Sequence, residues 1–303
     1  MLRDSGVDYS VIATGKLRRY FSWQNFVDAF KVPLGIFQSW RILKKFKPDV
    51  VFSKGGFVSF PVCRAASFLK IPVIIHESDI SPGLANKLSF KYAEKILLSF
   101  DESKKYLKEK FLKKAKVVGT PIRQEIFDGN AAAGRKFAGM DHHRPIILVM
   151  GGSQGARQIN ALVRENLSDL LKKFQVVHIA GRGNIDISVK KKGYKQYEFV
   201  QEQLKDLYAA AEMVVSRAGA NSLAEIAALR KKAVIVPLTH GASRGDQVQN
   251  AKVYAQKFAW SVLYGDVSGA DFLKAIALTH KNKLPDEKVQ NATKEIAKLI
   301  LKK

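Results

Sequence analysis

The clearest candidate for a ligand-binding site is the stretch 213–225, MVVSRAGANSLAE. The apolar run 213–215 predicts a short buried strand. Gly219 predicts a tight turn after it, because glycine takes backbone angles that other residues resist. Ser222 and Glu225 have the S-x-x-E spacing of a capping box, which predicts the start of a helix. A helix N-terminus beside such a turn offers free N–H groups to an anion, so the stretch predicts either a phosphate site or an ordinary strand–helix turn.

A second glycine-rich turn follows another apolar run. GGSQGAR (151–157) comes directly after PIILVM (145–150) and precedes a predicted helix. Its glycines allow the backbone to approach a ligand, and Ser153 can donate or accept a hydrogen bond. The segment is not the G-x-G-x-x-G of a dinucleotide fold, and it lacks the lysine of a P-loop. It favours a phosphate or nucleotide site of another kind.

Ionisable side chains gather after a third apolar run, PVIIHE (72–77). His76, Glu77 and Asp79 lie where that predicted strand ends, and ligands of open parallel sheets bind beyond the carboxyl ends of strands. The group suggests contact with a sugar or a metal, yet its spacing does not make a metal site. His76 is equally consistent with a hydrogen-bonded structural role. We expect no metal and no cofactor.

Two further loops carry polar residues able to contact a ligand. Arg123, in GTPIR, is suited to a phosphate. Gln247, in THGASRGDQVQNA, is suited to sugar hydroxyls and lies near a predicted helix start. The sequence contains no HExxH or CxxC, and no Ser-His-Asp signature stands out. The chemistry indicated is therefore binding of a phosphorylated sugar or nucleotide.

A regular alternation of strands and helices positions these loops. The predicted helices include a long one at 24–46, a charged one at 101–110 and a terminal one at 286–302. The predicted strands are 9–14, 49–53, 72–77, 95–100, 116–120, 145–150, 174–180, 197–200, 213–216 and 233–238. Such alternation implies α/β architecture, with parallel sheets wrapped by helices.

The alternation is interrupted once, by a polar and irregular segment with Gly and Ala at 121–144. We place the domain boundary within it. The expected division is an N-terminal domain at 1–128, a linker at 129–144 and a C-terminal domain at 145–303. Each domain is expected to be Rossmann-like, and the two are expected to face each other across a cleft.

The composition indicates a globular protein with an anionic partner. The 303 residues are 47% hydrophobic and carry a net charge of +24. Residues 1–129 hold 23 basic and 12 acidic residues, and the rest hold 28 and 15, so both halves are basic. This balance suits nucleic acid, anionic lipid or a phosphorylated substrate, or else reflects a lysine-rich proteome. The single cysteine, Cys63, excludes an intramolecular disulfide and fits a reducing compartment.

The long helix predicted at 24–46 combines aromatic and cationic residues. Its expected apolar anchors are Val27, Phe30, Leu34, Phe37 and Ile42. Trp40 lies near its end, and the basic residues in and around it are Arg18, Arg19, Arg41, Lys44, Lys45 and Lys47. A helix of this kind can lie on an anionic bilayer, or its aromatic side chains can face the domain core. No apolar run approaches the roughly 20 residues of a spanning helix, and no signal peptide is visible.

Six segments, in this order along the chain, jointly resemble glycosyltransferase family 28: GGFVSFP, HESDISPGLANK, GTPIR, GGSQGAR, SRAGANSLAE and RGDQVQNA. The resemblance covers essentially the whole chain. It implies the two-domain GT-B fold, with the donor held mainly by the C-terminal domain. It also implies transfer of N-acetylglucosamine from UDP-GlcNAc to undecaprenyl-diphosphate-linked muramyl-pentapeptide (lipid I), a step of peptidoglycan synthesis that serves cell division and shape. The implied location is the cytoplasmic face of the cell membrane, on its anionic surface.

The resemblance implies donor contacts for particular residues. Ser153 would contact the UDP diphosphate, and Arg123 would lie beside the nucleotide. Phe199 and Val200 would border uracil, and Gln247 would touch the sugar. A further segment would close on the diphosphate and the ribose, with its last residue holding ribose hydroxyls: Ala220, Asn221, Ser222, Leu223, Ala224 and Glu225.

Two features depart from the family pattern. The family usually has HEQN where this chain has HESD, so Asp79 replaces an amide that contacts the substrates and can only accept hydrogen bonds. The family also begins with a strand and a G-G-T-G-G-H loop whose histidine is a candidate general base, and Met1 aligns after that loop. We therefore expect an incomplete N-terminal domain, from a late start codon or a genuine truncation. The general base is unknown, with His76, Glu77 and Asp79 as candidates.

Two other functions stay open at this point. One is a non-catalytic or two-chain UDP-sugar-binding remnant that lacks the N-terminal catalytic loop. The other is a nucleic-acid binder, which rests on charge alone, and we expect no nucleic-acid partner. Salt-sensitive retention on nucleic acid without binding of UDP-GlcNAc would favour that last reading.

Overall fold

The computed structural model describes residues 6–15, 23–152, 154–239, 245–287, 289 and 291–302, without side chains for 23–30. The chain forms two compact units. The first comprises Met1–Gly119 and Lys294–Lys303, and the second Thr120–Thr293. The boundary lies earlier than the expected linker, and the last ten residues belong to the first unit.

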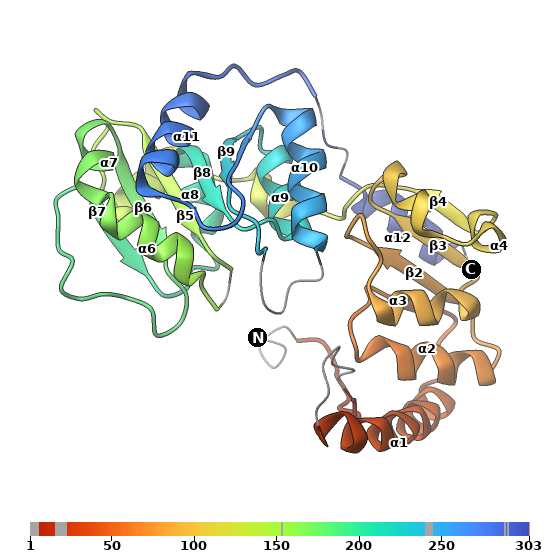
Figure 1. Ribbon diagram of the computed structural model, residues 1–303. Helices are drawn as coiled ribbons and strands as arrows, with labels where there is room; N and C mark the ends of the chain where they lie inside the picture. Colours follow the sequence, from red (N-terminus) through yellow and green to blue (C-terminus); the bar gives the residue numbers. More distant parts are fainter. Residues whose placement is uncertain are drawn as a thin grey trace. The chain divides into compact units, whose positions relative to one another are not determined.

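The first unit holds a four-stranded parallel sheet in the order β1-β2-β3-β4 (Figure 1). Its strands are β1 (Val51–Ser53), β2 (Val73–Glu77), β3 (Lys95–Leu98) and β4 (Ala115–Val117). The helical elements of this unit are α1 (Trp23–Phe46), α2 (Ser59–Phe68), α3 (Leu84–Ser89), η1 (Phe90–Tyr92), η2 (Asp101–Tyr106), α4 (Glu109–Leu112) and α12 (Thr293–Leu301). α1 and α2 pack against each other and contribute to one hydrophobic core with the strands.

Three predictions for the first unit are wrong. Residues 9–14 form no strand and instead lie against α1, where the Ala13 N–H donates to Gln38 Oε1 at 2.6 Å. The charged helix expected at 101–110 is a 3-10 helix followed by the short α4. Leu34 and Phe37, expected to anchor α1, are 49% and 54% exposed, whereas Leu43 is buried in the core.

The second unit holds a six-stranded parallel sheet in the order β10-β9-β8-β5-β6-β7. The strands are β5 (Ile146–Met150), β6 (Gln175–Ile179), β7 (Tyr194–Tyr197), β8 (Ala211–Ser216), β9 (Lys232–Ile235) and β10 (Ser261–Val262). From β7 at one edge the chain returns to place β8 on the other side of β5. This is the strand order of the doubly wound Rossmann fold, and the order reverses between β5 and β8.

Helices cover the central strands of the second sheet (Figure 1). Ile147, Val149, Met213 and Val215 pack in one core with α6 (Arg157–Glu165), α7 (Leu167–Lys173) and α11 (Gly269–Lys281). The alternate residues of the same strands, such as Leu148 and Val214, are also fully buried. Strands buried on both faces read as continuous apolar runs, which is why the sequence predicted them well.

The segment expected as a linker, 129–144, is part of the second unit. It contains α5 (Ala131–Ala138), which packs along α8 (Leu204–Ala210). A Cβ at Gly129 would lie 2.2 Å from the Lys205 carbonyl oxygen, and one at Gly134 would lie 2.1 Å from that of Asp206. The two glycines therefore allow close contact between the α5 segment and α8.

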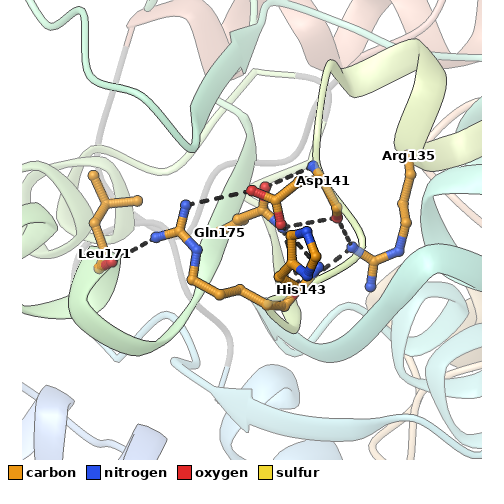
Figure 2. A network of polar contacts seen from close by, with 6 residues as sticks. Arg135, Asp141, His143, Leu171 and Gln175 are labelled. Carbon is orange, nitrogen blue, oxygen red and sulfur yellow. Dashed lines mark hydrogen bonds and ion pairs between the residues drawn. The ribbon is translucent and has the colours of Figure 1, made fainter.

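The end of this segment is held by a polar network (Figure 2). Gln175, the first residue of β6, accepts from the Asp141 N–H at 2.9 Å and donates to the Asp141 carbonyl at 3.1 Å. The Arg135 guanidinium donates to the same carbonyl and to that of Arg144. The Asp141 carboxylate accepts from the His143 N–H. These bonds join the residues after α5 to the start of the sheet, so 129–144 is not a linker.

Other strands and helices of the second unit begin or end at residues that differ from the predicted ones. β7 ends at Tyr197, so the expected strand at 197–200 lies mostly in the turn beyond it. β10 was not expected. The remaining helical elements of this unit are η3 (Gln124–Phe127), α9 (Ala220–Ala228) and α10 (Asp246–Phe258). In the first unit, the terminal helix α12 begins at Thr293 instead of 286.

Candidate active site

The first loop of the candidate site follows β5 at the point where the strand order reverses. Gly152 and Gly155 have φ angles of +84° and +77°, which side chains rarely adopt. A Cβ at Gly155 would lie 2.1 Å from the Ala180 carbonyl oxygen, just beyond the neighbouring strand β6. The loop therefore needs glycine to lie close to the end of the sheet. Ser153 falls outside the described residues.

Two helices begin beside this reversal of strand order. The N-cap residues of α6 and α9 are Ala156 and Gly219, and neither helix start receives a side-chain cap among the described residues. Uncapped N–H groups and the positive end of a helix dipole attract an anion. Because β5 and β8 are adjacent and parallel, both helix starts lie at the same edge of the sheet.

The start of α9 differs from the prediction. The helix begins at Ala220, with the Leu223 N–H bonded to the Gly219 carbonyl at 3.0 Å, so Ser222 is not the N-cap. Gly219 has φ −69°, so the turn does not require glycine, and among the described residues a Cβ there would meet only Ser222 Oγ, at 4.0 Å. The capping-box prediction is therefore wrong.

Glu225 has a different partner from the predicted one. Its Oε1 accepts from Arg123 Nη2 at 3.0 Å and from Nε at 3.3 Å. The Glu225 side chain is 13% exposed and the Arg123 side chain is 57% exposed. The structure thus brings together two residues that the resemblance assigned to the donor nucleotide.

The other residues of the 220–225 segment differ in how far their side chains are buried. Ala220, Leu223 and Ala224 have buried side chains, so only their backbone is available to a ligand. Asn221 is exposed and Ser222 is half-buried. The segment can therefore contact a phosphate through backbone N–H groups at its start and through polar side chains.

The remaining expected donor contacts lie at loops of the same unit. Phe199 and Val200 follow β7, and the Arg182 guanidinium lies 5.9 Å from the Phe199 ring centre. Gln247 is the second residue of α10, and its Oε1 accepts from the Leu238 N–H at 3.0 Å. A sugar contact by Gln247 would therefore use its amide nitrogen.

Sequence reasoning missed Arg217, which organises this edge of the sheet. Its Nη1 donates to Gln158 Oε1 at 3.0 Å and to the carbonyl oxygens of Val236 and Pro237 at 2.9 and 3.3 Å. These bonds connect the end of β8 to α6 and to the residues after β9. Its position directly after an apolar strand, in SRAGA, was the available signal.

The polar cluster of the first unit is centred on His76. Its Nδ1 lies 3.1 Å from Lys54 Nζ, and its Nε2 lies 2.9 Å from the Gly119 carbonyl oxygen. A protonated lysine only donates, so Nδ1 accepts and Nε2 carries the proton. Burial, with the nearby Lys54 charge, lowers the pKa of His76 to about 4. With both ring nitrogens engaged, His76 is poorly placed to accept a substrate proton.

Glu77 is likewise enclosed. Its carboxylate accepts from the N–H groups of Asp79 and Gly83 at 3.0 and 3.1 Å, and from Asn86 Nδ2 at 2.8 Å. Burial raises the pKa of Glu77, against the opposing effect of these donors. Glu77 therefore holds the turn that leads into α3. Asp79 is the partly exposed member of the three candidates.

Neither a metal centre nor a membrane span is found in the described part of the chain. No group of three or more His, Cys, Asp or Glu side chains there could hold a metal ion. No helix among the same residues is both long and apolar enough to cross a bilayer.

Two parallel α/β units, with glycine loops and uncapped helix starts where the strand order reverses in the second, have the GT-B fold. Residues 1–98 match the Glycosyltransferase family 28 N-terminal domain, and residues 146–303 match the Glycosyltransferase family 28 C-terminal domain. The chain belongs to glycosyltransferase family 28.

Relatives at high identity carry one name, UDP-N-acetylglucosamine–N-acetylmuramyl-(pentapeptide) pyrophosphoryl-undecaprenol N-acetylglucosamine transferase. The protein of Geobacillus kaustophilus is 48% identical, over 93% of this chain and 78% of its own length. That of Clostridium botulinum is 44% identical, over 100% of this chain and 87% of its own. The crystal structure of MurG from Acinetobacter baumannii shares the fold, with a TM-score of 0.72 at 23% identity over 100% of this chain and 87% of that one.

Proposed function

We propose that this protein transfers N-acetylglucosamine from UDP-GlcNAc to undecaprenyl-diphosphate-linked muramyl-pentapeptide in peptidoglycan synthesis. The observation that carries the proposal is the pair of uncapped helix starts, α6 and α9, beside the Arg123–Glu225 ion pair. The names of the relatives at 48% and 44% identity support the choice of substrates.

The donor is held by the second unit in this proposal. Its diphosphate lies at the start of α9, where N–H groups and the helix dipole stabilise the leaving UDP without a metal. Glu225 accepts from the ribose hydroxyls, and Gln247 donates to the sugar. Uracil lies against Phe199 and Val200. These roles use groups that the fold places at loops and helix starts of one unit.

The acceptor lies at the carboxyl end of β2 in this proposal. Inverting transfer needs a base for the acceptor 4-hydroxyl, and the group must reach the substrate. His76 and Glu77 are buried and Asp79 is partly exposed, so we assign substrate contact to Asp79 and a supporting role to the other two. An aspartate can accept from a sugar hydroxyl but cannot donate.

We also propose that the first unit rests on the anionic cytoplasmic face of the cell membrane. A shallow apolar cavity of about 440 Å³ lies on α1 and α2, lined by Pro33, Ile36, Phe37, Trp40, Arg64 and Phe68. Cations lie over its rings, with Arg64 3.8 Å from the Phe68 centre and Lys44 4.8 Å from that of Trp40. Exposed aromatic side chains with cations beside them suit the interface of an anionic bilayer. A role in cell division and shape follows from peptidoglycan synthesis there.

The proposal is tested by incubating the full chain with radiolabelled UDP-GlcNAc and a short-chain lipid acceptor carrying the diphospho-muramyl-pentapeptide. Transfer of label that depends on the acceptor supports it. Donor binding without transfer, at substrate concentrations where a relative is active, would instead support a UDP-sugar-binding protein without catalysis. Absence of both donor binding and transfer would contradict both readings.

A further inference from the structure

The side chain of Asn291 joins the two ends of the second unit, which begins at Thr120 and ends at Thr293. Asn291 Oδ1 accepts from the Ile122 N–H at 3.0 Å, and Asn291 Nδ2 donates to the Ile122 carbonyl at 2.9 Å. One amide side chain thus satisfies both backbone polar groups of Ile122, a residue 169 positions away in the chain. Two bonds from one planar amide fix both the position and the orientation of that backbone.

Two neighbouring residues support the same contact. The Thr293 hydroxyl lies 3.0 Å from the Ile122 carbonyl oxygen and 2.7 Å from Asn291 Oδ1, and it can donate to either. The Thr293 N–H also donates to Asn291 Oδ1, at 3.0 Å. The Ala292 N–H donates to the Thr120 carbonyl at 3.3 Å, and the side chains of Ile122 and Ala292 are buried. Residues 120–122 and 291–293 therefore hold each other firmly, and we call this pair of segments the clamp.

The clamp ends directly before Arg123, the residue that pairs with Glu225. The helix η3 begins directly after Arg123, and the Ile126 N–H donates to the Arg123 carbonyl at 3.3 Å. The backbone of Arg123 is therefore held from both sides. Its side chain is 57% exposed, so the guanidinium itself has few neighbours that restrict it. The point from which this side chain extends is consequently set by the backbone, and the clamp fixes that backbone.

We propose that Asn291 is a positioning residue of the donor site: it holds the backbone at Ile122 so that the Arg123 guanidinium meets the nucleotide diphosphate. A guanidinium recognises phosphate oxygens through paired N–H donors in a fixed geometry. Binding groups must be held within roughly 0.5 Å of the productive position, which requires support from residues that do not contact the ligand. The inference rests on the proposed function and adds such a supporting residue to it.

The test compares variants of the full chain by calorimetry with UDP and with uridine, which lacks the diphosphate. Asn291→Ala removes both bonds to Ile122, and Thr293→Val removes one hydroxyl from the clamp while keeping the shape of the side chain. Asn282→Ala is the matched control, because the Asn282 amide also donates to a backbone carbonyl, that of Ala259 at 3.3 Å, just before β10. Thermal unfolding measures whether each variant is folded at the temperature of the titration.

The loss of affinity should be specific to the diphosphate. Asn291→Ala should weaken UDP binding by about tenfold and Thr293→Val by about threefold, whereas uridine binding should change by less than about twofold in both variants. Asn282→Ala should leave the affinity for UDP unchanged. Added to Arg123→Gln, Asn291→Ala should cause no further loss of UDP affinity, because its effect passes through the guanidinium that is then missing.

The outcomes separate this inference from the proposed function. If the unmodified protein binds UDP and both clamp variants keep its full affinity, Asn291 serves the fold alone and the inference is overturned. Equal losses for UDP and uridine, or a further loss when Asn291→Ala is added to Arg123→Gln, would also overturn it, because the effect would not pass through the guanidinium. Should Asn291→Ala fail to fold, Thr293→Val decides by the same comparison. Failure of the unmodified protein to bind UDP would overturn the proposed function itself.

Discussion

The Arg123 guanidinium and the Glu225 carboxylate meet at 3.0 Å although 102 positions separate them in the chain. The contact joins the residues that begin the second unit to the first turns of α9. It pairs a mostly exposed cation with a largely enclosed anion on a helix whose start is uncapped. The candidate donor site is therefore built by one unit from distant parts of its sequence.

Glu225→Gln should weaken UDP binding by about 1–3 kcal/mol, the scale of a hydrogen bond to a charged group. The variant should lose less than about 1 kcal/mol of unfolding free energy, since Arg123 is mostly exposed. Calorimetry and urea unfolding measure the two quantities. Glu212→Gln is the control, because Glu212 pairs with His280 at the opposite end of β8. Unchanged UDP affinity in Glu225→Gln would remove Glu225 from the site.

Asp79→Ala should lower kcat/KM for the lipid acceptor by about 10- to 100-fold and leave the Kd for UDP-GlcNAc unchanged, because the change removes a charged hydrogen-bond acceptor. Glu77→Gln should instead lower the melting temperature, since that buried carboxylate accepts three hydrogen bonds. Initial rates at varied acceptor concentration measure kcat/KM for each variant. Full activity of Asp79→Ala would exclude Asp79 from substrate contact.

Acid should destabilise the second unit through His178. Burial and the charge of Arg164 lower the pKa of this histidine to about 3, while its Nδ1 and Nε2 contact Tyr194 and Asn160. The folded pKa lies below the unfolded value near 6.5, so the unfolded state binds more protons as the pH falls. The resulting stability is present above about pH 6.5 and is lost toward pH 3.

Between pH 7 and 5 the loss from His178 should reach about 2 kcal/mol. Urea unfolding of the unmodified protein and of His178→Gln at both pH values measures it. The variant should be less stable at pH 7 and should show a smaller drop at pH 5. His142→Gln, which changes an exposed side chain, is the control. Equal pH dependence in all three proteins would contradict the assignment.

The boundary of the donor-binding unit can be tested with fragments. A fragment of residues 120–293 should fold and bind UDP, because it keeps α5 and Arg123. A fragment starting at 140 should fold poorly, since it loses the helix that packs on α8 and the Arg135 bonds to the following carbonyls. Circular dichroism and calorimetry compare them. Equal folding and UDP binding by both fragments would show that the second unit does not need residues 129–139, as expected for a linker.

Membrane binding should depend on the lysines at the end of α1 and directly after it. Replacing Lys44, Lys45 and Lys47 with glutamine should weaken binding to vesicles containing anionic lipid by up to about 1 kcal/mol per residue, because each lysine is attracted to the negative surface. Replacing the exposed lysines at 190–192 removes the same charge from the other unit and serves as the control. Vesicle sedimentation measures both. An equal loss in the two variants would show that only net charge matters.

The class of fold and most of the strands could be predicted from the amino-acid sequence. β2, β3, β5, β6, β8 and β9 follow the predicted apolar runs closely, because strands of a parallel sheet are buried on both faces and need such runs. The segments between them also carried the family resemblance, since site residues follow strand ends in this fold.

Which residues contact each other became known from the folded structure. The S-x-x-E pattern predicted a local cap, but Glu225 pairs with Arg123, because packing and distant charge outweigh a local preference. The Gly129 and Gly134 contacts turned an apparent linker into part of the second unit. A strand as short as β10 shows no hydrophobic repeat in the sequence. The contacts of His76 with Lys54 and Gly119 show none either. They arise from neighbours that the chain brings together only when it folds.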